Sequence, residues 1–237
     1  MAKISGLSVR LFDSGVDLSG DTSALSGFST SQELLPITAL DDSSIQRIGG
    51  VKDATLTVNG WFDAATSHTA YINSGTIPTT DKTIIATMGT SRGDPALGGA
   101  AKEGSYDVDR QPGNAVATVA SFEASDGYPF EWGVLLTDGP AQTDSSATNS
   151  TAVDNSASSA DGAYGILNVI SVGSGTCDIA VQTSSDNVSF SDYLTFTGAT
   201  GATHEIVRSS SACGRYARVK TSGTFTDCKL VLMLARL

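Results

Sequence analysis

The chain has 237 residues, enough for one large domain or two small ones with a substantial core. It contains 32 serines, 27 threonines and 25 glycines, whereas only 16% of its residues are charged. This composition disfavours a helical bundle or a coiled coil. No apolar run approaches the roughly 20 residues of a transmembrane helix, and the start lacks the apolar segment of a secretory signal. We therefore expect a soluble protein, made in the cytosol of its producer, without a membrane partner.

The net charge of −11 is concentrated in the first part of the chain. There, 17 acidic and 8 basic side chains precede residue 141, whereas 8 acidic and 6 basic ones follow it. An acidic surface repels phosphate groups, so the charge disfavours tight nucleic-acid binding. A surface along which DNA passes without sticking would need this sign of charge.

Alternating apolar residues predict that the first 138 residues form strands joined by polar turns. The predicted strands cover residues 7–11, 55–62, 83–88, 105–109, 116–124 and 129–136. One short helix is expected between Asp63 and Ile72, with Asp63 as its N-cap and Gly75 after its end.

The segment from Asp17 to Gly50 shows only weak periodicity and is predicted to be a long projecting loop. Its apolar residues sit among Ser, Asp and Gly; they are Leu34, Leu35, Ile37 and Leu40. Apolar side chains on a projecting loop need a partner surface, because exposure to water is unfavourable for them.

Residues 139–163 are predicted to be a Ser/Thr/Ala-rich linker, since Val153 is their only large apolar residue. The linker would separate a unit of residues 1–138 from a unit of residues 164–237. The second unit reads as a small β-sandwich, with predicted strands at 164–172, 177–181, 193–197, 204–207, 216–221 and 229–235.

The three cysteines form neither a disulfide framework nor a zinc site, because they are odd in number and widely spaced. They are Cys177, Cys213 and Cys228, and we expect them to be small buried residues on strands.

The sequence offers little material for catalysis. His68 and His204 fall in different predicted units and have no acidic or Cys neighbour at ligand spacing. Residues 89–93 match the G-x-S-x-G nucleophile elbow, but the glycine-broken stretch after them predicts a turn between strands instead. We predict no catalytic, cofactor-binding or metal-binding residues, and we expect that the protein is not an enzyme.

Two further motifs have non-catalytic interpretations. The run Asp107-Val108-Asp109 resembles the start of a calcium loop, but Pro112 and Gly113 break the required order, which favours a solvated strand face. The aromatic cluster at residues 128–132 fits a sugar-binding platform or, preferably, core aromatics at a strand edge.

Several stretches together resemble the major tail (tail tube) proteins of long-tailed bacteriophages, particularly of phages that infect actinobacteria. In the first unit they are ISGLSVRLFDSGVDLSGD, ITALDDSSIQRIGGVKDATLTVNGWFD, IPTTDKTIIATMGTSRGD and DGYPFEWGVLLTDG. In the second unit, DIAVQTSSDNVSFSDYLTFTGAT and GRYARVKTSGTFTDCKLVLMLAR resemble a β-sandwich module that is appended to many of these proteins.

This resemblance implies an all-β fold: a tail-tube β-sandwich or barrel-forming domain with one short helix, plus a small C-terminal β-sandwich on the outer surface. It implies hexameric rings that stack into a hollow tube in the phage tail, assembled in the host cytoplasm. DNA would pass through the lumen without specific binding, and the other partners would be tape measure, terminator and distal tail proteins. No cofactor is implied.

The resemblance also gives roles to the residues singled out above. Leu34, Leu35, Ile37 and Leu40 would contact an adjacent subunit or ring. The carboxylates expected to line the lumen are Asp107 and Asp109, with Glu103 and Glu123 as weaker candidates. Two alternatives stay open, a capsid head decoration protein and a carbohydrate-binding module within residues 164–237.

Overall fold

The computed structural model describes residues 8–72 and 74–237, and it consists of strands with one short helix. The predicted all-β class is confirmed. The strand predicted at residues 7–11 begins at Leu7, outside the described residues, and the first strand is β1 (Arg10–Asp13).

The remaining elements follow in chain order. Residues up to 138 form β2 (Val16–Asp17), β3 (Thr22–Pro36), β4 (Arg47–Trp61), α1 (Ser67–Tyr71), β5 (Lys82–Thr87), β6 (Pro95–Asp109), β7 (Ala117–Ala124) and β8 (Glu131–Leu135). Later residues form β9 (Gln142–Asp144), β10 (Thr148–Asn149), β11 (Val153–Asp154), β12 (Ala163–Ser171), β13 (Ser174–Ser184), β14 (Ser191–Thr195), β15 (Thr203–Ser209), β16 (Tyr216–Thr226) and β17 (Cys228–Arg236).

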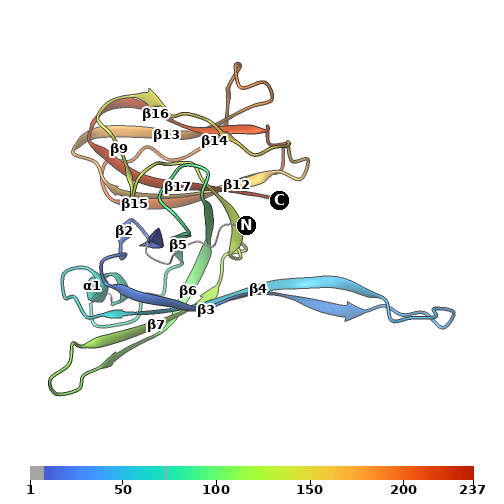
Figure 1. Ribbon diagram of the computed structural model, residues 1–237, viewed down its shortest axis with the longest axis horizontal. Coiled ribbons are helices and arrows are strands. Elements are labelled where there is room, and N and C mark those ends of the chain that lie inside the picture. Colours follow the sequence, from blue (N-terminus) through green and yellow to red (C-terminus); the bar gives the residue numbers. More distant parts are fainter. Residues whose placement is uncertain (1–7, 73) are drawn as a thin grey trace.

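A large sheet runs through the whole molecule, with strand order β15-β12-β17-β8-β6-β5-β1-β2. It continues from β6 through β7 and β4 to β3, while β9 pairs with β17. A smaller sheet has the order β10-β16-β13-β14, with β11 on β16. The smaller sheet covers β12 and β17 and forms the sandwich at the top of Figure 1.

The sandwich core forms where alternate side chains of both sheets point inward. It contains Ile179 and Val181 from β13, Leu230 and Leu232 from β17, and Cys177. All three cysteines are buried and have free thiols, as predicted.

The segment predicted as a linker, 139–163, is not free chain. Within it, β9 pairs with β17, and β10 and β11 pair with β16. Val153, its one large apolar residue, belongs to the sandwich core. Composition does not predict these short strands, because they are held by backbone hydrogen bonds, which need no large side chains.

The two predicted units also share a core and a sheet. Met233 and Leu234 of β17 pair with Leu135 and Val134 of β8. One hydrophobic cluster combines residues of both units, namely Phe12, Ile85, Ala96, Leu135, Tyr164, Ile166, Val231, Met233 and Ala235. A chain cut after Asp138 would therefore expose Phe12 and Ile85, rather than leave an intact first unit.

The helix is shorter than predicted. It spans five residues, and Asp63 stabilises the turn before it rather than the helix itself. The Asp63 carboxylate accepts hydrogen bonds from the backbone N–H groups of Ala65 at 2.7 Å and Thr66 at 3.1 Å. The short helix lies over one end of the sheet that β4, β6 and β7 form (Figure 1).

The strand β6 contacts both β5 and β17 at Gly98, where these neighbours lie too close for any residue other than glycine. A Cβ at Gly98 would lie 2.6 Å from the backbone oxygen of Ile84 and 2.7 Å from the Met233 sulfur. Neither Cβ distance occurs in relaxed structures, because both are well inside van der Waals contact.

We predict that Gly98→Ala destabilises the protein by about 1–3 kcal/mol, since β5 and β17 would both have to move. Thermal or urea unfolding measures the change. Gly20→Ala is the matched control, because a Cβ there meets nothing within 4 Å. Equal stability of the two variants would contradict the close approach.

Candidate assembly surfaces and a buried ionic cluster

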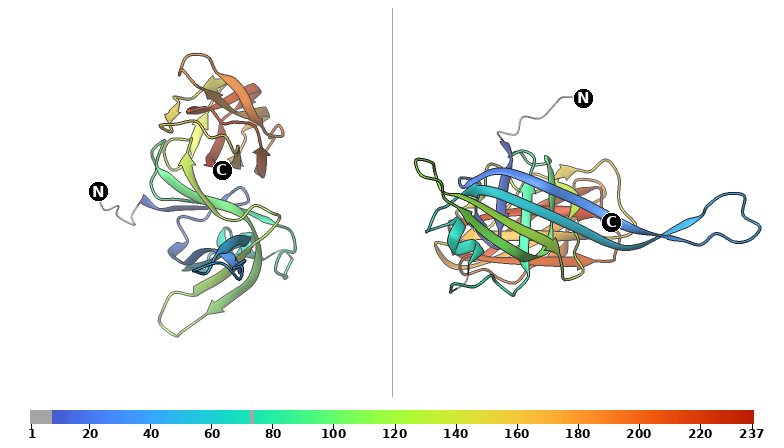
Figure 2. Two further views of the ribbon diagram at one scale, coloured as in Figure 1. Left: turned by 90° about the vertical axis from the view of Figure 1, so that its right-hand side faces the viewer. Right: turned by 90° about the horizontal axis from the view of Figure 1, so that it is seen from below.

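The segment predicted as a loop over 17–50 forms most of a long hairpin, in which β3 pairs with β4 from Thr22↔Gly60 to Pro36↔Arg47. The loop prediction was wrong because hairpin strands exposed on both faces carry no apolar alternation. The outer part of the hairpin extends far beyond the body (Figures 1 and 2). We call residues 33–51 the arm.

The arm exposes its apolar side chains. Leu34 is 60% exposed and Val51 is 76% exposed. The full set of exposed apolar residues is Leu34, Leu35, Ile37, Leu40, Ile45, Ile48 and Val51. The sequence interpretation found the first four and missed the last three, although Ile45, Ile48 and Val51 follow at a three-residue spacing.

The arm makes its hydrogen bonds within the hairpin, as far as the described residues show. The backbone N–H of Ile37 donates to the Gln46 carbonyl, and the N–H of Ala39 donates to the Asp42 carboxylate at 2.6 Å. The ion pair between Lys52 and Glu131 holds the base of the arm to β8. The arm is therefore an ordered hairpin whose apolar surface is not covered by the body.

A β-bulge at Gly104 decides which way the acidic residues of β6 point. Without it, Glu103, Asp107 and Asp109 would share one face. The pairing shifts between Glu103↔Phe122 and Ser105↔Ser121, so Glu103 turns toward the core and the two aspartates turn outward. The predicted lumen role of Glu103 is therefore wrong, since this residue is buried.

Asp107, Asp109 and Glu123 lie on the outer face of the β4–β7–β6 sheet and are exposed. That face is mostly polar, with Thr55, Thr57 and Asn59 of β4 as well as Ser105 and Ser121, whose hydroxyl oxygens lie 2.8 Å apart. Its apolar exception is Trp61, which is 49% exposed and lines a shallow hollow with Asp109. The two aspartates sit toward the free end of the β6–β7 hairpin, and Glu123 sits at its other end, beside Lys102.

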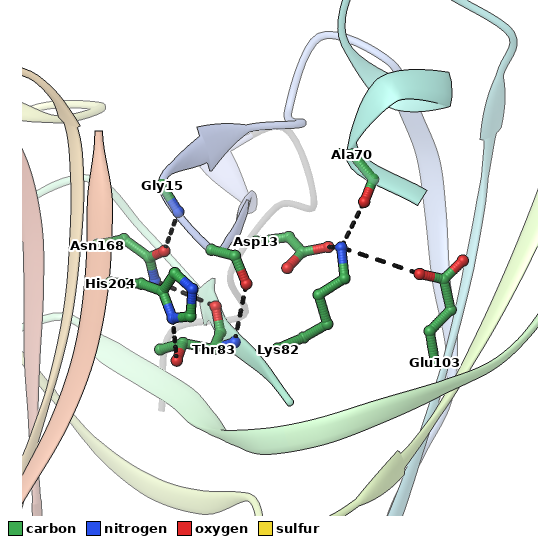
Figure 3. A network of polar contacts seen from close by, with 9 residues as sticks. Asp13, Gly15, Ala70, Lys82, Thr83, Glu103, Asn168 and His204 are labelled. Carbon is green, nitrogen blue, oxygen red and sulfur yellow. Dashed lines mark hydrogen bonds and ion pairs between the residues drawn. The ribbon is translucent and has the colours of Figure 1, made fainter. Parts of the chain in front are cut away.

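A buried ionic cluster lies on the opposite face of the same sheet (Figure 3). Lys82 Nζ lies 3.4 Å from Asp13 Oδ2 and 3.9 Å from Glu103 Oε2. It also donates a hydrogen bond to the Ala70 carbonyl of α1. The three charged side chains come from adjacent strands β1, β5 and β6, and the sequence analysis did not connect them.

Burial governs the protonation of this cluster. It raises the pKa of Asp13 above the ordinary carboxyl value, although Lys82 opposes the shift. Burial likewise raises the pKa of Glu103 to about 8, with Lys82 opposing and Asp13 adding to the shift. Near neutral pH, Glu103 is therefore largely protonated, which leaves one carboxylate opposite one ammonium.

A polar junction next to the cluster ties the C-terminal sandwich to β5 and to the β1–β2 turn (Figure 3). Asn168 accepts a hydrogen bond from the Gly15 N–H at 2.5 Å and donates one to the Thr83 carbonyl at 3.3 Å. His204 Nδ1 lies 2.9 Å from the Thr83 hydroxyl, and burial lowers its pKa.

The two histidines and the G-x-S-x-G match at residues 89–93 have structural roles. His68 packs on the rings of Phe62 and Tyr106, apart from the His204 junction. Residues 89–93 form a turn between β5 and β6 with no helix after it, which confirms the turn interpretation. Among the described residues, no group of three or more His, Cys, Asp or Glu side chains could hold a metal ion.

The aromatic cluster at 128–132 divides between core and surface. Phe130 is buried and stacks edge-on against Phe28 at 5.5 Å, as the core interpretation predicts. Trp132 is 56% exposed and borders an apolar groove of about 520 Å³ with Leu25 and Met88. In residues 164–237, none of the six aromatic side chains is exposed, and the Arg218 guanidinium covers the Phe190 ring.

The described part of the chain has no helix that is long and apolar enough to cross a membrane.

No protein-family model and no curated protein matches the chain. Among solved structures, it is similar to a chain of the virion of a native gene transfer agent particle, with 15% identity and a TM-score of 0.41 over 54% of this chain and 98% of that one. A chain from the tail of an empty gene transfer agent particle, refined with C6 symmetry, has 18% identity and a TM-score of 0.39, covering 55% and 98%.

A third structure, the SPP1 Dit protein, described as a paradigm of the hub adsorption apparatus in phages that infect Gram-positive hosts, has 11% identity and a TM-score of 0.34. The match covers 99% of that chain and 97% of this one. Sequence identities and TM-scores as low as these do not establish a shared function.

The raised pKa of Glu103 predicts how stability changes with pH. Between its ordinary pKa of 4.5 and about 8, the folded state keeps a proton that the unfolded state loses, so Glu103 makes the free energy of unfolding fall as pH rises. Replacing Glu103 by Gln removes this titration. We predict a smaller drop in Tm between pH 5 and 8 for Glu103→Gln than for the unmodified protein.

The matched control is Glu123→Gln, an exposed carboxyl on the neighbouring strand, which should leave the drop in Tm unchanged. Parallel Tm curves for Glu103→Gln and the unmodified protein would contradict the assigned protonation.

Proposed function

We propose that this chain is a structural virion protein that polymerises as stacked hexameric rings into the tail tube of a long-tailed bacteriophage. The observation that carries the proposal is the arm, an ordered hairpin that holds seven exposed apolar side chains beyond the body. Burying a large apolar side chain stabilises an assembly by roughly 1.5–3 kcal/mol. A second copy of the chain is the partner that this surface requires.

The sheet beside the arm supports the same proposal. In the described structure, β3 has β4 as its one partner strand, so its other edge carries unpaired backbone donors and acceptors. Such an edge is prone to uncontrolled pairing unless another strand covers it. Strands from neighbouring copies would cover the edges and close a barrel, with the core-facing side outward and the polar side inward.

The polar face with Asp107, Asp109 and Glu123 would then line the lumen. Its hydroxyls and carboxylates suit a surface past which a genome moves without specific binding, because DNA carries one negative charge per roughly 1.7 Å of its axis. The remaining partners would be the tape measure, terminator and distal tail proteins that the sequence resemblance implies, and the protein would have no enzymatic activity.

A head decoration protein is the weaker alternative, because it needs neither a stacking arm nor an acidic channel. A sugar-binding module in residues 164–237 is weaker still, because its aromatic side chains lie in the core or under arginine side chains.

The arm is tested by shortening it. Replacing residues 33–51 by Asn-Gly joins the paired residues Gln32 and Lys52 through a two-residue hairpin turn. We predict a folded protein with an unchanged circular dichroism spectrum that forms no tubes in negative-stain micrographs, whereas the full chain forms tubes. Deleting 21–31 instead would remove Leu25 and Phe28, which pack on the core.

The control for the shortened arm is Ser43→Ala with Ser44→Ala, which changes exposed polar residues at its tip and should leave assembly intact. Tubes of normal length from the shortened chain would exclude the arm as the stacking element. Featureless monomers from the full chain would contradict polymerisation itself.

The lumen is tested by reversing its charge. Asp107→Lys together with Asp109→Lys should leave the subunit folded, since both positions are exposed. Phage with this change should adsorb normally but eject DNA poorly, and added salt should relieve the defect by screening the new charges. Ejected DNA is measured as nuclease-sensitive DNA after receptor triggering.

Asp161→Lys with Asp178→Lys makes the same change of charge at exposed positions after residue 140 and should leave ejection normal. A similar defect in both pairs, or a tube structure with Asp107 and Asp109 on its outer wall, would overturn the lumen assignment.

A further inference from the structure

The buried ionic cluster holds an amine against a carboxyl group, with both side chains almost completely withdrawn from solvent. Lys82 Nζ lies 3.4 Å from Asp13 Oδ2, which places the amine directly beside that carboxyl group. The residues are almost completely buried, with 0% of Asp13, 7% of Lys82 and 6% of Glu103 exposed. Asp13, Lys82 and Glu103 lie on one face of adjacent strands, so the backbone pairing fixes their spacing.

Most of the carboxyl oxygens in the cluster lack a hydrogen-bond partner. Asp13 Oδ1 and both oxygens of Glu103 are buried and have no hydrogen-bond partner among the described residues. Buried polar atoms are nearly always paired, so three unpaired oxygens within one cluster need an explanation. A simple buried ion pair would normally be completed by further hydrogen bonds, because desolvation of the charges is otherwise too costly.

The surroundings favour the uncharged forms of the two carboxyl groups. Tyr71 and Tyr106 lie over the cluster with ring centroids 5.3 Å apart, and Phe122 stacks on Tyr71 at 6.0 Å. Burial raises the pKa of both carboxyl groups. An amide bond needs a neutral amine beside a neutral carboxylic acid, and this pair would form when the Lys82 ammonium passes a proton to the Asp13 carboxylate.

We propose that the folded chain joins Lys82 to Asp13 by an amide bond between their side chains, with Glu103 as the proton relay. The Lys82 nitrogen attacks Asp13 Cγ, and a C–N bond forms. Glu103 donates its proton to the departing Asp13 hydroxyl and receives one proton from the Lys82 nitrogen. The C–O bond breaks, one water molecule leaves, Glu103 is regenerated, and nothing is oxidised or reduced.

Each neighbour of the amine has a part in this step. The Ala70 carbonyl of α1 accepts a hydrogen bond from Nζ and so orients the nitrogen. Glu103 Oε2 is 3.9 Å away, farther than Asp13, which makes Asp13 the acyl group and Glu103 the relay. Asp13 Oδ1 has no hydrogen-bond partner among the residues that the structure describes, so it can become the amide oxygen or the leaving water.

A second Lys–Asp pair, which is exposed, shows how burial distinguishes the Lys82–Asp13 pair. Lys102 Nζ lies 3.1 Å from Asp81 Oδ1, closer than in the buried pair, but the two side chains are 48% and 35% exposed. Water solvates both side chains there, so this pair stays an ordinary surface ion pair. Burial and the relay, rather than distance alone, distinguish the Lys82 pair.

The bond would close a covalent ring through two residues that are 69 positions apart. The ring contains the complete β3–β4 hairpin with its arm, as well as α1. Because β1 is short and pairs on one side with the two-residue β2, the cross-link would fix it to β5 where the sheet is least extensive. This inference does not depend on the proposed tail-tube role.

The test is the intact mass of the purified full-length chain, measured by electrospray after denaturation and reduction. We expect a mass lower than that of the sequence by one water molecule. After tryptic digestion, the cleavage at Lys82 should be missing, and peptide 53–92 should be joined to peptide 11–47. Fragmentation of the joined pair should place the link between Asp13 and Lys82.

Three variants separate the cross-link from other dehydration. Lys82→Arg keeps the charge but removes the reacting amine, and should have the full sequence mass. Glu103→Gln should form the bond at least tenfold more slowly. Lys102→Arg alters the exposed pair and should lose water like the unmodified chain. Circular dichroism establishes that each variant is folded.

Two outcomes would overturn the proposal. One is a full sequence mass for the folded, unmodified protein. The other is a loss of water that persists in Lys82→Arg, or that maps to an Asp-Gly pair such as Asp126-Gly127, where a succinimide also loses one water. If Lys82→Arg does not fold, the tryptic map of the unmodified chain still decides between these outcomes.

Discussion

The strand β6 is the constraint on which the rest of the molecule depends. Its first half pairs with β5 and β8 and thereby connects to the C-terminal sandwich, whereas its second half pairs with β7 and connects to the arm-bearing sheet. Gly98 allows the first half to lie against Met233 and Ile84, and the bulge at Gly104 reverses the facing of the second half. One strand therefore determines the joint between the two halves, the buried position of Glu103 and the exposed positions of Asp107 and Asp109.

The parts of the fold that depend on alternation could be predicted from the sequence. Strands such as β4 beyond Thr55 and β7 have one buried face, so their buried residues recur at every second position. The strand β17 is buried on both faces and is recognised by its continuous apolar run instead. The arm gave no such signal because both of its faces are exposed, and the 139–163 strands gave none because they contribute backbone rather than side chains. The bulge escaped prediction because a glycine in a strand has several structural explanations.

The candidate sites, like the strands, could be predicted only where a local sequence pattern marks them. The exposed character of Asp107 and Asp109 followed from strand parity, and the apolar residues of the arm were visible as residues without a predicted core. Asp13, Lys82 and Glu103 could not be connected, because they lie in separate strands and only the β1–β5–β6 register brings them together. Long-range pairing of this kind leaves no local pattern in a single sequence.

The acidic charge of the first unit divides between two opposite physical settings. On the outer face of the β4–β7–β6 sheet, Asp107, Asp109 and Glu123 are solvated, so they contribute a repulsive field at little energetic cost. On the inner face, burial raises the pKa of Asp13 and Glu103, and Lys82 lies opposite both, so the cluster carries almost no field. A count of charges along the chain therefore overstates the field near the sheet, and the strand register decides which carboxylates a passing polyanion would meet.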